Sequence, residues 1–149
     1  MREILFRGKD RLGHWLYGGF HLWKTRQPCV CNDELKPEEI KHIIIKNSFA
    51  DWNMPRTMQP YEVIPETIGQ YTGLTDKNGK KIFEGDIVNF KTTAYHFKNC
   101  RIKYQSCYAR YCAIDNKGYE YPMDKAFEYE IIGNTHDNPE LLKECENNV

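Results

Sequence analysis

Hydrophobic and β-branched residues occur in short runs separated by turn residues, a pattern typical of β-strands. Two such runs cover Ile68–Leu74 and Ile82–Phe90, and Asn78-Gly79 lies in the polar segment between them. Asn tolerates the left-handed backbone region and Gly has no Cβ, so this pair favours a tight antiparallel hairpin. Glu84-Gly85-Asp86 interrupts the second run and predicts a corner between two short strands. Short strands that turn at glycines are typical of a small barrel.

The same pattern predicts strands on both sides of this central segment. They cover Glu3–Arg7, His14–Trp23, Arg101–Gln105, Cys107–Ile114, Tyr119–Tyr121 and Tyr129–Ile132. Gly18-Gly19 is expected to bend or bulge the second of these strands. Asp115–Gly118 predicts a second hairpin turn, and Lys91–Asn99 and Ser48–Pro60 are interpreted as loops.

Two segments carry signals for short helices. Pro37-Glu38-Glu39 predicts a helix start, because Pro suits the first turn and acidic residues interact favourably with the positive end of the helix dipole. Ile43–Ile45 also suits a strand, so a helix that runs into a strand is an open alternative. Asn138-Pro139-Glu140 predicts a terminal helix from Pro139 to about Glu146, with Asn as its cap.

We therefore expect a mainly β protein with a few short helices. Residues 61–149 are predicted to form a small antiparallel barrel, SH3-like or partly open, with a terminal helix. Residues 1–60 are predicted to form an N-terminal β lobe with a variable helix or loop insertion, and its strands pack on the barrel or form a second sheet. A chain of 149 residues suits one domain or two small lobes.

The segment Ile64–Val88, which reads IPETIGQYTGLTDKNGKKIFEGDIV, closely resembles the hallmark of the YopX family of small phage and prophage proteins. Met1–Gly8 resembles the N-terminal strand of that family, and Tyr129–Leu142 resembles its closing strand and helix. The resemblance spans the chain. It implies a mostly β fold and a phage or prophage setting, and it supplies no catalytic residues to transfer.

Charge and composition narrow the class of function. Lys plus Arg and Asp plus Glu both number 21, so the chain is not a strongly basic nucleic-acid binder, although a local basic patch remains open. No secretory leader and no apolar stretch of membrane-spanning length are found. We expect a protein of the bacterial host cytoplasm, with its six cysteines mostly reduced and no membrane partner.

The sequence shows no motif for catalysis or for a cofactor. A nucleophile elbow and a P-loop are both missing, so we expect no enzyme activity and no cofactor. His21, Cys29 and Cys31 are the weak candidates for a metal site, but Cys29-x-Cys31 is shorter than the usual zinc-ligand spacing. We expect buried or incidental thiols and no metal.

Two binding hypotheses remain. The ten tyrosines favour an unknown protein partner or self-association. The alternative is weak or structured-site nucleic-acid binding, because small barrels bind single strands with aromatic platforms and a basic groove. Alternation places Ile102 and Tyr104 on one strand face and Arg101 and Lys103 on the other. The basic and aromatic candidates are Arg101, Lys103, Tyr104, Tyr108, Arg110 and Tyr111, for which a solvated strand face is the alternative interpretation.

Overall fold

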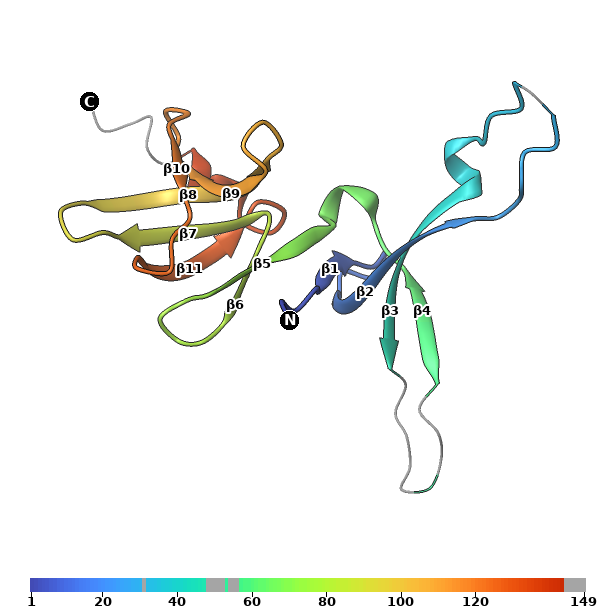
Figure 1. Ribbon diagram of the computed structural model, residues 1–149, viewed down its shortest axis with the longest axis horizontal. Coiled ribbons are helices and arrows are strands. Elements are labelled where there is room, and N and C mark those ends of the chain that lie inside the picture. Colours follow the sequence, from blue (N-terminus) through green and yellow to red (C-terminus); the bar gives the residue numbers. More distant parts are fainter. Residues whose placement is uncertain (31, 48–52, 54–56, 144–149) are drawn as a thin grey trace. The chain divides into compact units, whose positions relative to one another are not determined.

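The computed structural model describes residues 1–30, 32–47, 53 and 57–143, which fold as two compact units (Figure 1). The N-terminal unit comprises Ile4–Ile68, and the C-terminal unit comprises Gly69–Val149 together with Met1–Glu3. The division lies between Ile68 and Gly69, whereas the sequence analysis placed it near residue 60. Strands dominate both units, so the prediction of a mainly β protein is confirmed. Among the described residues, no helix has the length and apolar character needed to cross a membrane.

Four antiparallel strands build the N-terminal unit, side by side in the order β4-β3-β2-β1. They are β1 (Phe6–Lys9), β2 (Trp15–Lys24), β3 (Ile40–Asn47) and β4 (Met58–Glu62), with 3-10 turns η1 (Pro37–Glu39) and η2 (Pro65–Thr67). β3 holds the centre of this unit, because Ile44 lies opposite both Phe20 and Tyr61 and is fully buried.

The glycine pair in β2 has two different roles. A Cβ at Gly18 would lie 2.1 Å from the carbonyl oxygen of Ile45, so only glycine allows β2 to approach β3 this closely. A Cβ at Gly19 would meet nothing within 4 Å. Gly18 is therefore required by packing, whereas Gly19 borders open space.

The predicted helix at Pro37 is wrong beyond its first turn. Pro37–Glu39 forms a single 3-10 turn, and the chain continues as the strand β3 from Ile40. Strand pairing with β2 and β4 buries consecutive isoleucines on both faces, with Ile43 6% exposed and Ile44 fully buried. A helix could also place Ile40, Ile43 and Ile44 on one face, so tertiary pairing and not the apolar spacing overrides the local start signal.

Five antiparallel strands and a hairpin build the C-terminal unit. The hairpin consists of β5 (Gly69–Thr75) and β6 (Lys81–Phe83). The sheet has the order β10-β9-β8-β7-β11. Its strands are β7 (Asp86–Lys91), β8 (His96–Gln105), β9 (Arg110–Ile114), β10 (Glu120–Pro122) and β11 (Glu128–Asn134). Within the described part of the chain, no pairing joins β10 to β11, so the sheet is open and does not form a closed barrel.

Two further element predictions need correction. The segment Lys91–Asn99 was interpreted as a loop, but β8 already begins at His96. The terminal helix is only a 3-10 turn, η3 (Pro139–Leu142), and its predicted end at residue 146 lies outside the described residues.

The predicted turns of the C-terminal unit are confirmed. Asp76 closes the β5–β6 hairpin: its N–H donates to the carbonyl of Lys80 at 2.8 Å, and its carboxylate accepts the N–H groups of Asn78 and Lys80. Gly79 and Gly85 both have positive φ, at 79° and 86°. The Asp86 carboxylate is buried at the Gly85 corner and accepts the N–H of Phe83 at 2.8 Å.

The core of the C-terminal unit lies between the hairpin and one face of the sheet. Its buried members are Ile82, Val88, Phe90, Cys100, Ile102, Ala113 and Tyr129. The hairpin tip is fixed on β11, because the Lys77 N–H donates to the Tyr129 carbonyl at 2.8 Å. The Lys77 ammonium also pairs with Glu130 at 2.8 Å.

Candidate functional site

The register of β8 and β9 divides the predicted nucleic-acid residues between two faces. Tyr104 lies opposite Tyr111, and their rings meet edge to face with centroids 5.2 Å apart. Neighbouring residues of a strand point to opposite faces, so Lys103 and Arg101 lie on the other side of the sheet from Tyr104. Both of these cations are exposed. The predicted alternation is correct, and it separates the two basic residues of β8 from the tyrosine pair.

The turn between β8 and β9 holds the other two predicted residues. The Arg110 guanidinium lies over the ring of Tyr108 at 4.9 Å from its centroid, in cation–π geometry. Tyr108 is 60% exposed. Arg110 lies opposite Gln105 at the start of β9, so strand alternation places it on the face of Lys103 and opposite the tyrosine pair.

A hollow of about 420 Å³, here called the β8–β9 hollow, collects part of the predicted set with residues from elsewhere in the C-terminal unit. Its chemistry is set by two aromatic residues, three cations and one acid, namely Tyr104, Tyr111, Arg2, Arg110, Lys125 and Asp124. The Tyr111 hydroxyl donates to the side-chain oxygen of Gln70 at 3.1 Å, and burial is the main cause that raises the Tyr111 pKa. Tyr111 is therefore a fixed, neutral wall of this hollow.

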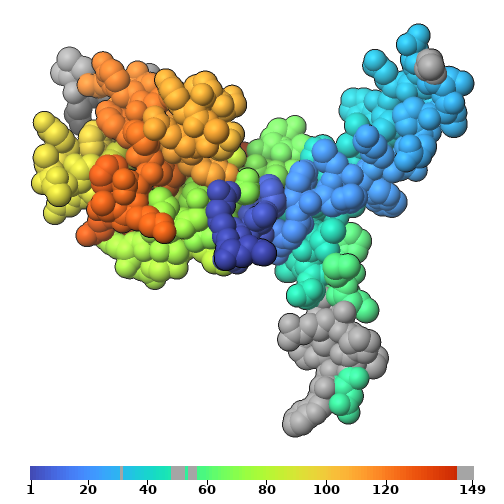
Figure 2. Space-filling view, in the orientation of Figure 1, coloured from blue at the N-terminus to red at the C-terminus, as the bar shows by residue number. Residues whose placement is uncertain are grey.

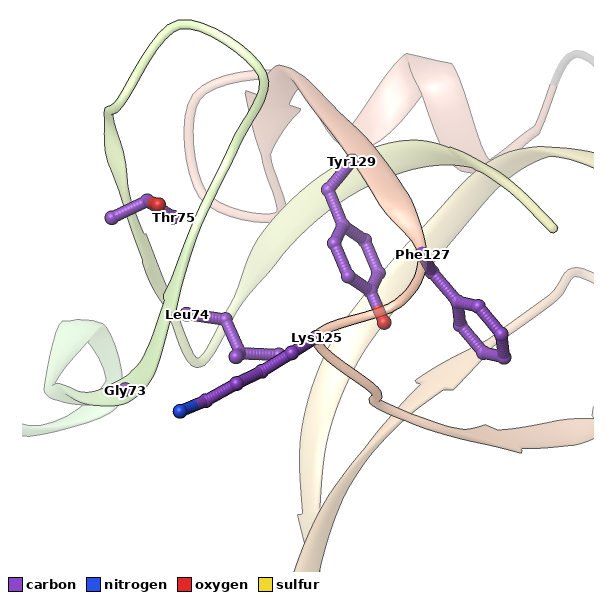
Figure 3. Close-up of a pocket in the computed structure, with 6 residues that line it drawn as sticks. All are labelled: Gly73, Leu74, Thr75, Lys125, Phe127 and Tyr129. Atoms are coloured by element: carbon purple, nitrogen blue, oxygen red, sulfur yellow. The ribbon is translucent and has the colours of Figure 1, made fainter.

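A second, smaller hollow of about 210 Å³ adjoins the first and shares Leu74 and Lys125 with it. Figure 3 shows the Lys125 side chain extending along Leu74 toward Gly73, with its ammonium group directed away from the Tyr129 ring. The Tyr129 hydroxyl accepts the N–H of Asp124 at 3.0 Å, and burial raises the pKa of Tyr129 to about 12. Lys125 is thus the cation common to both hollows.

The N-terminal unit carries a groove of about 510 Å³ beside the glycine pair, here called the glycine groove. Its described lining residues are Leu5, Tyr17, Gly18, Gly19, Ile45, Lys46, Asn47 and Met58. Tyr17 and Met58 are 45% and 74% exposed. Figure 2 draws β3 in teal and β4 in green.

Lys46 is the charged residue among the described lining residues of this groove. Its ammonium lies 5.8 Å from the centroid of the Tyr61 ring. Within the described chain it forms no ion pair with a carboxylate, whereas Arg11, His14, Arg26 and Lys41 of this unit each lie within ion-pair distance of one. The groove therefore combines apolar surface with one uncompensated positive charge.

The candidate metal residues are not assembled into a site among the described residues. His21 lies in β2 opposite Ile43. Cys29 is exposed, with its N–H donating to the Asp33 carboxylate at 3.1 Å, and Cys31 lies outside the described residues. No group of three His, Cys, Asp or Glu side chains in the described part of the chain is placed to hold a metal ion.

Sequence reasoning missed the remote residues of both candidate sites. Arg2 and Lys125 line the β8–β9 hollow from opposite ends of the sequence, and no local pattern connects them to Tyr104. For the glycine groove a signal existed in Gly18-Gly19, but it was interpreted only as a bend. Whether the space next to Gly19 is open depends on the pairing of β2 with β3, which the local sequence does not specify.

Three comparisons relate the chain to known proteins. The sequence model of the family described as YopX protein matches residues 19–143. No curated protein matches the chain. Among solved structures, the chain is similar to protein EF1440 from Enterococcus faecalis, with 24% sequence identity and a TM-score of 0.46. That similarity covers 95% of this chain and 99% of the other.

Proposed function

Because the chain belongs to the YopX family, we propose that it is a phage- or prophage-encoded accessory protein that acts by binding another protein and not by catalysis. We place it in the cytoplasm of the bacterial host. The phage setting is supported by the family resemblance of Ile64–Val88. The location is supported by Cys29, Cys107 and Cys112, whose thiols form no disulfide in the described part of the chain, as the reducing cytoplasm favours.

The observation that carries this proposal is the glycine groove. Large apolar side chains that remain exposed next to a concave surface are typical of protein-interaction sites. Tyr17 supplies contact area together with a polar hydroxyl, a combination that is enriched among the residues dominating binding energy at interfaces. Met58 adds an adaptable apolar side chain on the opposite wall.

The groove also indicates what kind of segment it accepts. Its apolar walls suit an apolar stretch of a partner protein, and Lys46 suits a carboxylate next to that stretch. The described lining residues include no histidine, cysteine or carboxylate, the side chains that most often act as nucleophile or general base. This composition supports binding over catalysis.

Gly19 allows a sharp test, because a side chain at this position would enter the groove without striking the backbone. We would capture the tagged chain from host cells with nuclease present, and compare the wild type with Gly19→Leu and Tyr17→Ala. Each variant is expected to lower recovery of the partner at least tenfold, since loss of a dominant contact residue such as Tyr17 costs about 2 kcal/mol or more and the Leu side chain at position 19 would occupy the groove. Leu12→Ala is the matched control, because Leu12 is 82% exposed and lies outside the groove.

Two outcomes would count against the proposal. One is the absence of any nuclease-resistant partner. The other is equal recovery of the partner with the wild type and Gly19→Leu. Sedimentation of the purified chain distinguishes self-association from binding of a different protein. A dimer that Gly19→Leu dissociates would identify a second copy as the occupant of the groove.

A further inference from the structure

Three cations without carboxylate partners surround the β8–β9 hollow. Arg2, Arg110 and Lys125 line it, and in the described part of the chain none of them forms an ion pair. Asp124 also lines it, but one of its carboxylate oxygens already accepts the N–H of Ala126 at 2.8 Å. The residues that line the hollow therefore carry more positive than negative charge, and one further carboxylate, that of Glu84, accepts the Tyr104 N–H at 3.3 Å.

Other lysines of the same unit show that this excess is local. Lys77 pairs with Glu130 at 2.8 Å, and Lys81 pairs with Glu3 at 2.7 Å. Unpaired cations that converge on a concave surface raise the local concentration of anions. A guanidinium is particularly suited to phosphate, because its planar N–H groups can donate in pairs. Arg2 lines this hollow and can supply such a guanidinium group.

The tyrosine pair adds a recognition surface for a planar group. Tyr111 is held by its hydrogen bond to Gln70 and supports Tyr104 through the edge-to-face contact. Tyr104 itself is 41% exposed. An aromatic ring that is fixed on one side and exposed on the other is suited to stack with a nucleic-acid base, since every base has a π-face.

From these three observations we propose that the β8–β9 hollow binds a nucleotide unit, with the base against Tyr104 and the phosphate near Arg2 and Lys125. The volume of about 420 Å³ lies in the range of known small-molecule sites. The two sources of such a unit are a free nucleotide and single-stranded nucleic acid. This proposal is independent of the glycine groove, which belongs to the other unit.

The hollow differs from the binding face predicted from the sequence. That prediction used Arg101 and Lys103, which lie on the opposite face of the sheet from Tyr104. The hollow instead uses Lys125 and Arg2, which the fold brings to the tyrosine pair. The two versions therefore predict different effects of substitution, and the cations of β8 serve as a matched control.

The experiment is fluorescence anisotropy of a labelled ten-nucleotide oligo-dT with the full chain, with thymidine 5′-monophosphate and inorganic phosphate as competitors. Two phosphate-contacting cations predict a slope of about −1.4 for log affinity against log salt, which is about a sevenfold fall between 50 and 200 mM. The double variant Arg2→Ala, Lys125→Ala should lose at least tenfold in affinity and remove most of that slope.

The control double variant Arg101→Ala, Lys103→Ala should keep its affinity within twofold, and Tyr104→Leu should weaken the oligonucleotide and the mononucleotide equally. Circular dichroism of each variant verifies that the sheet is intact. If the mononucleotide competes with the same affinity as the oligonucleotide, the ligand is a free nucleotide. If the oligonucleotide binds tenfold more tightly, the ligand is a single strand. The proposal is overturned by absence of binding at 50 mM salt, by equal losses in the two double variants, or by phosphate competing as well as the nucleotide.

Discussion

Substitution of Gly18 by alanine is predicted to destabilise the N-terminal unit, whereas the same change at its neighbour Gly19 is not. The added methyl group at Gly18 would lie 2.1 Å from the Ile45 carbonyl oxygen and 2.9 Å from its carbonyl carbon. Both are backbone atoms, so no side chain can rotate away. Real Cβ atoms essentially never lie closer than 3.0 Å to another heavy atom, so β2 and β3 would have to separate by about 0.9 Å.

The magnitude follows from what that separation disrupts. Forcing an extra methyl group into a closely packed site costs about 1–3 kcal/mol. Each backbone hydrogen bond lost between the two strands adds about 1 kcal/mol. We therefore expect Gly18→Ala to lower the free energy of unfolding by about 2–3 kcal/mol. Gly19→Ala should be neutral or stabilising by up to about 1 kcal/mol, because alanine reduces the entropy of the unfolded chain where the backbone accepts it.

Tryptophan fluorescence during urea unfolding measures this loss of stability in the N-terminal unit. Trp15, Trp23 and Trp52 are the tryptophans of the chain, and all three belong to Ile4–Ile68. With an m-value of about 1 kcal/mol/M for a small unit, the midpoint should fall by about 2 M for Gly18→Ala. Equal midpoints for the two alanine variants, or a greater loss at Gly19, would refute the close approach of β2 to β3.

Three other predictions concern single contacts. Asp86→Ala leaves the buried N–H of Phe83 without its carboxylate acceptor, so thermal unfolding should show a loss of about 1–3 kcal/mol. The Arg26 guanidinium lowers the pKa of Asp33. Carboxyl pKa values by NMR should show Asp33 rising in Arg26→Ala, and the stabilisation by this pair should be present above about pH 4 and be lost as pH falls further. Burial raises the pKa of Tyr129 to about 12, so absorbance titration should show it still protonated where exposed tyrosines ionise, and stability should decrease as pH rises from about 10 to 12.

Local turn chemistry made the central hairpin predictable. Gly79 and Gly85 each have a positive φ that few other residues adopt, so their positions determine where the chain reverses. These signals act within four or five residues and do not depend on the rest of the fold. The strands on either side of them were therefore located correctly from the sequence.

The segment Pro37–Asn47 could not be assigned from local signals. Pro-Glu-Glu favours the first turn of a helix, and the following isoleucines suit either a helix or a strand. The choice was decided by pairing with β2 and with β4, a strand from much later in the sequence. The structure does contain one turn at this start signal, and the strand takes over at Ile40.

The beginning of β8 was hidden by an irregularity. Asn99 has a φ of 53°, and the register between β7 and β8 shifts between Val88 and Phe90. The Asn99 N–H donates to the side-chain oxygen of Asn89 at 3.0 Å, which holds this bulge in place. A bulge breaks the alternation of apolar and polar residues, so the pattern from His96 onward resembled a loop.

The candidate sites were only partly predictable for a related reason. The alternation of Arg101, Lys103 and Tyr104 along β8 was correct from the sequence, because it needs only the period of a strand. The grouping of Tyr104 with Lys125 and Arg2 depends on how β10, β11 and the N-terminal residues pack on the sheet. No spacing within the sequence encodes that grouping.

The hairpin tip on β11 has a consequence for aggregation. An outer strand with unpaired N–H and C=O groups is a template on which another chain can add a strand and extend the sheet. On β11 the tip contact at Lys77 occupies the Tyr129 carbonyl, and the Lys77–Glu130 pair places charge beside it. At the other side of the sheet, β10 has only three residues and ends at Pro122, which cannot donate a backbone hydrogen bond. Both borders are therefore blunted against strand addition, and opening of the hairpin tip would be the step that exposes this sheet to growth into fibres.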